Sequence, residues 1–515
     1  MNYYIKIILI NLILLFASCS DMMQNYDSSA DEDVPPVPSV EIIINNGDKF
    51  CYNRHVQISC DYQYSESIDS IAFSDDNINW TNMIKPVNVY PWDFDYIPCE
   101  KTVFCKYVDS SGVSRFASDS IMYLDRISEM NTYMFSEDIA VSGDFSVIAV
   151  SGLIENKGNL FLCTVKNDDW QIYRADLGSE TDYMTGLSIS MNLSGTEIAV
   201  GDSNNNSGKG RVIILKRGVD GGTSLFQHLD STADKKFGYS TDLSDSEDIL
   251  AVTALGDGVY SGALMLYKRE PAGWNIMETF VPSALDSDDK HERFGNCVSL
   301  SSNGSAVAVG DPEYKRIDAG VVTICGRVTV YRKSAGVYAP IELYEEDKTT
   351  LSVSVLSTGI NFGDAVSLNS DASLLAVGVP QKGNGEVIIY RYDSVNEIYY
   401  RIKTLGCPPG NVFSGGYSFG GSLDFSAENR LFINAPFFSD SNLGDKCGNI
   451  FISDFPYNSI GSYITPDAAA DDYFGYSFAA SADGKSVAVG SLRDDRDGIN
   501  DAGSVYIIRN SSVFK

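Results

Sequence analysis

Short runs of alternating apolar and polar residues fill most of the chain, and three of them form one unit near its end. Within residues 474–510, one run opens at Phe474-Gly475, a second spans 487–490 and a third spans 504–508. The third run is rich in β-branched and aromatic residues, which is typical of half-buried strands. Three strands alone leave an edge and a face uncovered, so the sequence predicts neighbouring units of the same kind.

These neighbours form a repeat with seven copies. In each copy a glycine precedes two alternate aliphatic residues, and a short apolar run lies upstream of it. Five copies also carry the pair Phe-Gly further upstream, whereas the first two keep Phe135 without its Gly and Gly186 without its Phe. The seven glycines are Gly158, Gly210, Gly262, Gly326, Gly385, Gly448 and Gly503, and the Phe-Gly pairs begin at Phe237, Phe294, Phe362, Phe419 and Phe474.

A repeat of this length with several strands is typical of a β-propeller, in which each copy forms one four-stranded blade. The phrases FGDAVSLNSDASLLAVGVP and LFINAP resemble FG-GAP repeats, as found in the integrin α-subunit propeller and in many bacterial surface proteins. The resemblance covers residues 135–510 and implies a seven-bladed β-propeller over 126–515. It implies a fold rather than a function, because one fold supports many functions.

The fourth strand of each blade is expected between its third strand and the next Phe-Gly. The seventh blade lacks room for one, because only seven residues follow its third strand. An uncovered third strand would be an aggregation hazard. We therefore expect a segment within residues 126–134 to supply the missing strand and close the ring, and the alternative is that Val513-Phe514 turns back to complete the blade. The six other fourth strands are expected within 170–173, 225–229, 274–280, 338–343, 399–405 and 460–464.

The N-terminus begins with an apolar run, 7–16, that follows Lys6. It is too short to span a bilayer, which needs ~20 apolar residues, and it is typical of a signal peptide. The run ends in FASC, which resembles a bacterial lipobox, so residues 1–19 are predicted to be a lipoprotein signal peptide with the lipid attached to Cys19. The alternative is ordinary secretory cleavage, with Cys19 incidental.

Residues 20–38 are acidic and rich in proline, so they are expected to form an extended tether. Residues 39–125 have no Phe-Gly motif and hold six short alternating runs, as an immunoglobulin-like β-sandwich does. The wording IAFSDDNINW and KTVFCKYVDSSGVS resembles the Ig-like modules of bacterial surface proteins, which are spacers or docking units. The chain is therefore predicted to be all-β. The six runs are 40–44, 56–60, 68–73, 93–97, 102–107 and 120–124.

Four cysteines lie in the predicted sandwich. Cys60 and Cys105 fall on the apolar phase of their strands. If these are the second and sixth strands, the two cysteines face each other as an inter-sheet disulfide would. Cys51 and Cys99 precede the same strands, in loops expected at one end of the sandwich. The alternative is four buried thiols, and four cysteines allow three pairings.

The charge of the chain is strongly negative, at −31 with a pI near 4.3. This opposes binding to nucleic acid and to anionic lipid, both of which require basic patches. Membrane association is therefore expected only through the lipid anchor, on the bacterial outer membrane or cell surface. The acidity suits solubility outside the cell, and the alternative is attraction for cations or basic partners.

Calcium is considered because the resemblance implies it. Integrin propellers bind Ca²⁺ through Asp-x-Asp-x-Asp-Gly-x-x-Asp in the hairpin between first and second strands, where oxygen ligands suit a hard cation. That hairpin is short in this chain, so these sites are not expected. In another loop, Asp495, Asp497 and Asp501 match the later part of the pattern, with Arg493 at the first-ligand position. The alternative to a calcium site there is a solvated acidic hairpin, and no other cofactor is expected.

Catalysis finds little support, because the three histidines lie in three different units and no nucleophile elbow or His-based metal motif is present. We therefore expect a non-enzymatic surface lipoprotein whose propeller binds an extracellular protein or glycan. Its binding surface is expected on the long loops between second and third strands, which carry Tyr314, Phe437 and Phe438. The alternatives are loops without function, and a propeller hydrolase or lyase that acts on an extracellular polysaccharide.

Overall fold

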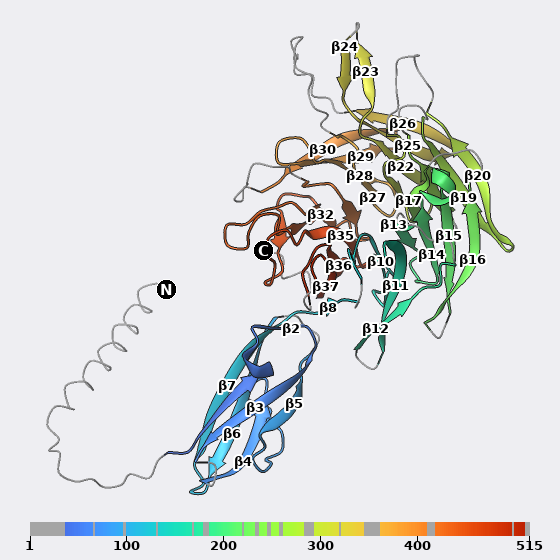
Figure 1. Cartoon of the computed structure of the whole chain (residues 1–515). Coiled ribbons are helices and arrows are strands. Elements are labelled where there is room, and N and C mark those ends of the chain that lie inside the picture. Colours follow the sequence, from blue (N-terminus) through green and yellow to red (C-terminus); the bar gives the residue numbers. More distant parts are fainter. Residues whose placement is uncertain are drawn as a thin grey trace, which may run out of the picture. The chain divides into compact units, whose positions relative to one another are not determined.

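The computed structural model is all-β and divides into two compact units (Figure 1). Of the described residues, one unit comprises those up to Gly47 with Gln57–Trp92 and Lys101–Ser120, and the other comprises those within Asp48–Val56, Asp93–Glu100 and from Ile121 onward. The predicted signal peptide, its Cys19 and most of the tether lie outside the described residues. The structure describes residues 37–64, 67–95, 99–129, 132–166, 169–178, 185–218, 221–231, 236–244, 249–256, 261–282, 293–318, 321–344, 361–408, 418–496 and 499–509.

The N-terminal strands form two sheets, each of which contributes buried apolar residues. The strands expected at 40–44, 56–60, 68–73 and 102–107 are confirmed. The strand expected at 93–97 begins earlier, because β5 spans Val89–Asp93 and residues 94–95 lie outside it, whereas residues 96–97 are outside the described residues. One sheet has the order β1 (Ser39–Ile44), β3 (His55–Gln63), β5 (Val89–Asp93), and the other β2 (Phe50–Cys51), β7 (Ser114–Tyr123), β6 (Cys99–Asp109), β4 (Ile68–Ser74).

Seven four-stranded antiparallel sheets make up the rest of the described chain (Figure 1). In order, they are β9 (Ile139–Val141), β10 (Val147–Ile154), β11 (Lys157–Lys166), β12 (Asp169–Arg174); β13 (Thr185–Met191), β14 (Glu197–Asp202), β15 (Arg211–Arg217), β16 (Thr223–Asp230); β17 (Phe237–Leu243), β18 (Ile249–Ala254), β19 (Ala263–Glu270), β20 (Gly273–Phe280); β21 (Val298–Leu300), β22 (Ala306–Asp311), β25 (Arg327–Ser334), β26 (Val337–Tyr344); β27 (Val366–Leu368), β28 (Leu374–Val379), β29 (Glu386–Asp393), β30 (Ile398–Gly406); β31 (Leu423–Phe425), β32 (Leu431–Ala435), β33 (Asn449–Ser453), β34 (Gly461–Tyr463); and β35 (Phe474–Ala480), β36 (Ser486–Ser491), β37 (Ser504–Arg509), β8 (Arg126–Ile127).

The first strands of these sheets form a closed ring. Each of β9, β13, β17, β21, β27 and β31 contacts the first strand of the next sheet, and β35 returns to β9. Sheets arranged radially around a central channel constitute a β-propeller. All six expected fourth strands are confirmed as β12, β16, β20, β26, β30 and β34.

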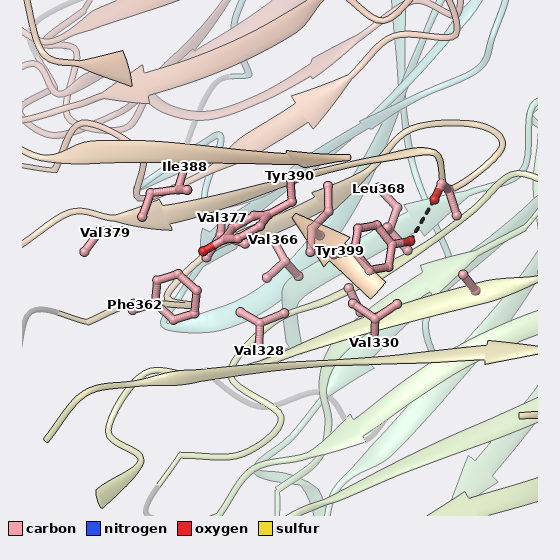
Figure 2. Packing of buried hydrophobic residues seen from close by; sticks show 14 residues of the cluster. Val328, Val330, Phe362, Val366, Leu368, Val377, Val379, Ile388, Tyr390 and Tyr399 are labelled. Carbon is pink, nitrogen blue, oxygen red and sulfur yellow. Dashed lines mark hydrogen bonds between the residues drawn. The ribbon is translucent and has the colours of Figure 1, made fainter. Parts of the chain in front are cut away.

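Apolar side chains fill the space between neighbouring sheets. In Figure 2, Val328 and Val330 of β25 lie in one cluster with Val377 of β28 and with Phe362, the phenylalanine of a Phe-Gly pair. Tyr399 of β30 donates its hydroxyl to the carbonyl oxygen of Ala372 at 2.7 Å. Burial of this kind stabilises by about 25 cal/mol per Å² of apolar surface, so the contacts between sheets are a main source of stability.

The repeated glycine and phenylalanine meet across the boundaries between sheets. Gly448 has a φ of +84°, and a Cβ atom there would lie 2.0 Å from the carbonyl oxygen of Phe474 in the next sheet. Gly503 has a φ of +80° and meets the carbonyl oxygen of Phe135 in the same way, at 2.3 Å. Only glycine fits both the backbone conformation and the space. The repeat in the sequence therefore encodes the junction between adjacent sheets.

The ring is closed by the segment that the sequence predicted. Strand β8 pairs with β37 in the register Val505↔Ile127 and Tyr506↔Arg126. Arg496, in the loop before β37, is buried and joins the two ends of the propeller, because its guanidinium donates to Gly503 O at 2.8 Å and to Thr132 Oγ1 at 3.0 Å. The prediction that residues 126–134 complete the last sheet is confirmed.

Three small elements were not predicted. A hairpin of β23 (Lys315–Asp318) and β24 (Val321–Ile324) stands in the loop between β22 and β25. Single-turn helices are assigned at η1 (Asn45–Gly47) and α2 (Asn205–Gly208). Within the described part of the chain, no helix has the length and apolar character needed to cross a membrane.

Candidate functional site

The channel at the centre of the propeller is the candidate site. It is a cavity of about 840 Å³, and all seven first strands contribute to its lining. Ligand pockets in proteins measure ≈ 300–1,000 Å³, so the channel has the size of a binding site. Two groups of side chains line it: one lies within the first strands, and the other lies where the chain enters them.

The side chains within the first strands hold neighbouring sheets together. Asp138 Oδ2 accepts the N–H of Ile189 in the next sheet at 2.6 Å, and Asp242 Oδ2 accepts that of Leu300 at 2.6 Å. The same contact recurs at four further boundaries, with a serine or an aspartate as the acceptor. These contacts join Ser188 to Thr241, Ser299 to Leu368, Ser367 to Phe425 and Asp424 to Ala480.

Two of these carboxyl groups have strongly altered acidity. Removal from water raises the pKa of Asp138 to about 7, although the N–H groups of Ile189 and Ile139 oppose the shift. The pKa of Asp424 is raised to about 7 as well, by removal from water and then by the negative charge of Asp242, against the opposing N–H of Ala480. The inner channel is therefore an acidic environment in which negative charge is poorly compensated.

The second group is a ring of seven residues that we call the mouth ring. Each occupies the position directly after the Phe-Gly pair or its equivalent, and each lines the channel. The residue before it has a positive φ and is a glycine in six copies, for example at +82° in Gly238 and +84° in Gly475, and a serine in the first copy, Ser136 at +93°. The mouth ring consists of Glu137, Leu187, Tyr239, Asn296, Asp364, Gly421 and Tyr476.

Polar groups connect one half of the mouth ring. Arg293, which also lines the channel, donates from Nη2 to Asn296 Oδ1 at 2.7 Å and to the hydroxyl of Tyr239 at 3.3 Å. Asn296 donates in turn to the backbone oxygen of Asp364 at 2.9 Å and to its Oδ1 at 3.3 Å. Burial raises the pKa of Asp364, although Arg293 opposes the shift. These side chains come from three adjacent sheets and form one network.

The other half of the mouth ring is centred on Tyr476. Burial raises the pKa of Glu137, and a hydrogen bond with the Tyr476 side chain opposes this shift. Asn434 donates to the backbone oxygen of Tyr476 at 3.4 Å. Phe437 also lines the channel, with 37% of its surface exposed, and its ring packs edge-on against Tyr473 at 5.2 Å between centroids. Gly421 leaves this half of the ring without a side chain at one position.

The three aromatic residues expected on the binding surface have different environments. Phe437 lies at the channel, as a ligand-binding residue would. Tyr314 is buried, with only 4% exposed, because its ring is covered by the Arg327 guanidinium at 4.4 Å and lies against Tyr344. The expectation that it is exposed is therefore wrong. Phe438 is half-buried and packs against Phe451, so it belongs to the core between sheets.

The acidic loop considered for calcium is organised by its own hydrogen bonds. Asp495 Oδ1 accepts the N–H of Asp501 at 2.8 Å, and Asp501 lies 3.8 Å from Arg493. Asp497 lies outside the described residues. No group of three or more histidine, cysteine or carboxylate side chains with metal-binding geometry occurs among the residues that the structure describes. The weak calcium site stays a prediction.

Cys60 and Cys105 lie at buried strand positions as predicted, whereas Cys51 and Cys99, which were expected in loops, lie in strands β2 and β6, and all four cysteines are free thiols. Cys60 lies in β3 and Cys105 in β6, in different sheets, and both side chains are buried as thiols. Burial, together with the smaller effect of nearby Cys60, raises the pKa of Cys105 to about 12. Cys51 is buried and Cys99 is exposed. The disulfides therefore stay predictions, of which Cys60–Cys105 has the better placement.

One position of the repeat, the residue after Phe-Gly, identifies the mouth ring in the sequence. The residue after Phe-Gly varies among the copies, with only tyrosine occurring twice, so it is not part of the shared pattern of the repeat. A left-handed glycine before that residue turns it out of the strand direction and toward the channel. The composition of the mouth can thus be read from one position of the repeat.

Comparisons with known proteins find one family model and a number of solved structures that resemble the chain. The FG-GAP repeat family model matches residues 462–508. Solved structures that resemble the chain include the Cps50 (Swd1) β-propeller domain of Myceliophteria thermophila, at 11% identity and a TM-score of 0.47, with 74% of this chain and 98% of that chain covered. The Dos1 propeller resembles it at 10% identity and a TM-score of 0.42, with 92% of each chain covered. A Lactobacillus plantarum protein does so at 11% identity and a TM-score of 0.43, with 78% and 97% covered. No curated protein matches the chain.

Proposed function

We propose that this chain is a bacterial cell-surface lipoprotein whose propeller is a non-enzymatic adhesion module for an extracellular protein or glycan. The observation that carries the proposal is the mouth ring, in which a variable residue from each repeat is directed into one cavity. Rigid strands that present variable side chains at one opening are typical of binding sites. The shared residues of the repeat build the frame, and the variable position supplies the specificity.

The proposal includes the finer architecture. The closed ring of seven first strands supports a seven-bladed propeller over residues 126–515. The two sheets of residues 39–125, with buried apolar residues in both, support an immunoglobulin-like sandwich that acts as a spacer. Attachment of lipid to Cys19 would place both domains on the outer membrane or cell surface, and the net charge of −31 disfavours nucleic acid as a partner.

One observation favours the enzymatic alternative, a hydrolase or lyase that acts on an extracellular polysaccharide. Two channel carboxyl groups, those of Asp138 and Asp424, have a pKa raised to about 7, as a general acid requires. Each of them also accepts a backbone N–H from the neighbouring sheet, which assigns it to the frame of the propeller. We therefore favour binding without turnover.

Arrays of glycans and extracellular proteins, probed with the full-length chain, test this proposal. We expect retention of one class of molecule, and unchanged products when the retained molecule is incubated with the chain and analysed by mass spectrometry. Cleavage of a retained polysaccharide that is lost in Asp138→Asn and Asp424→Asn would replace the binding function with the enzymatic one. Exposed Glu397→Gln is the matched control for the effect of removing one carboxylate.

A further inference from the structure

We propose that the mouth ring binds the uncharged end of an extracellular glycan. This inference rests on the proposed binding function and deepens it, because it names the ligand class and the residues that select it. It is carried by three features of the described residues: the aromatic and polar side chains at the mouth, the sign of the charge in the channel, and the size of the cavity.

The side chains at the mouth match the chemistry of a sugar. Tyr239 and Tyr476 are both half-buried and line the channel from different sheets. Aromatic faces pack against the C–H surface of a sugar ring, since both surfaces are apolar. Between the tyrosines, Arg293 and Asn296 are N–H donors and Asp364 is a carboxylate acceptor. A hydroxyl group donates and accepts at once, so a mouth that offers both partners suits a molecule covered with hydroxyl groups.

The charge of the channel selects among sugars. Five carboxyl groups line the cavity against the single arginine, Arg293, and no lysine is present in this lining. A uronic acid or a sulfated sugar would bring more negative charge into an environment that already raises carboxyl pKa values, as it does for Asp138 and Asp424. An uncharged sugar avoids that repulsion. The five carboxyl groups are those of Glu137, Asp138, Asp242, Asp364 and Asp424.

The size of the cavity separates a glycan from a folded protein partner. Stable protein interfaces extend over a broad surface, whereas this site is a recess of about 840 Å³, within the ≈ 300–1,000 Å³ typical of pockets for small ligands. A recess of that size accommodates a narrow chain end. The absence of a side chain at Gly421, beside Tyr476 on the neighbouring sheet, widens the entrance for it.

Isothermal titration of the full-length chain tests the inference directly. The probes are matched panels of neutral, amino and uronic-acid oligosaccharides, and we expect binding of a neutral member with a Kd at least tenfold lower than that of its uronic-acid counterpart. Tyr476→Ala and Tyr239→Ala should each weaken binding about tenfold, the equivalent of 1.4 kcal/mol. Tyr476→Phe keeps the aromatic face and should bind within about threefold of the wild type.

The matched control is Tyr400→Ala, which removes an exposed tyrosine from the outer strand β30 and should leave binding unchanged. Circular dichroism of each variant identifies any loss of folding. Tighter binding of uronic-acid sugars would overturn the inference, and so would neutral-sugar binding that neither tyrosine variant weakens. Retention of extracellular proteins without any glycan would also overturn it but leave the proposed binding function intact. Loss of all binding on both arrays would count against the proposed function itself.

Discussion

A buried arginine stabilises the closure of the ring, and its replacement should destabilise the propeller at one defined place. Arg496 is only 4% exposed, and its guanidinium donates to Gly503 O, to Thr132 Oγ1 and to Glu129 O. Arg496→Met keeps most of the side-chain volume and removes all three hydrogen bonds. A hydrogen bond to a charged group contributes about 1.5–3 kcal/mol, and the carbonyl groups left without a donor lie in a poorly hydrated site. We therefore expect the free energy of unfolding to fall by about 3–6 kcal/mol.

Such a loss is large beside the 5–15 kcal/mol that stabilises a typical domain. The assay is hydrogen exchange of the full-length chain at increasing urea concentration. In Arg496→Met, exchange in β8 and β37 should accelerate at a lower urea concentration than in the wild type, because the pairing of these two strands closes the ring. Arg401→Met, on the exposed side of β30, is the control and should change stability by no more than about 0.5 kcal/mol. Equal exchange rates and stability in the two variants would refute the role of Arg496 in closing the ring.

Three further predictions concern the junctions, the channel and the anchor. Gly448→Ala should lower the free energy of unfolding by more than about 2 kcal/mol, because its Cβ would collide with Phe474. Gly406→Ala is the control, because a Cβ there meets open space, and equal melting temperatures of the two variants would contradict the prediction. Because the folded-state pKa of Asp424 is raised to about 7, wild-type stability should fall as pH rises from about 4 to 7. Asp424→Asn should reduce the dependence of the unfolding free energy on pH, as measured by urea titration at several pH values, and an unchanged dependence would contradict the raised pKa. Cys19→Ser should release the protein from membranes or block its processing, and wild-type fractionation of this variant would exclude the predicted anchor.

The framework of the propeller was predictable because equivalent residues form the same strands and the same contacts between sheets in every copy. Alternating apolar positions give the strands, and the junction between Gly503 and Phe135 explains why Phe135 persists although its glycine has been lost. The closing strand followed from a physical requirement, since an uncovered third strand is an aggregation hazard that a neighbouring segment must cover. These predictions needed no side-chain detail.

The site was less predictable, because it depends on directions that a sequence does not display. Tyr314 and Phe437 both lie in loops between second and third strands, yet one is buried beneath Arg327 and the other lines the channel. Tyr239 and Tyr476 are adjacent to Phe-Gly pairs and read as ordinary strand residues. Only the left-handed glycine before each of them, together with the closed ring, directs them into a common cavity.

Hydrogen exchange of the full-length chain, with and without the neutral oligosaccharide that binds it best, tests most directly whether the mouth ring is the binding site. We expect slower exchange in the segments that begin β13, β17 and β35, around Tyr239 and Tyr476, because a bound sugar restricts access to the channel from several sheets at once. The outer strands β16, β20 and β30 should be unaffected. Protection confined to those outer strands, or to the β23–β24 hairpin, would contradict the assignment.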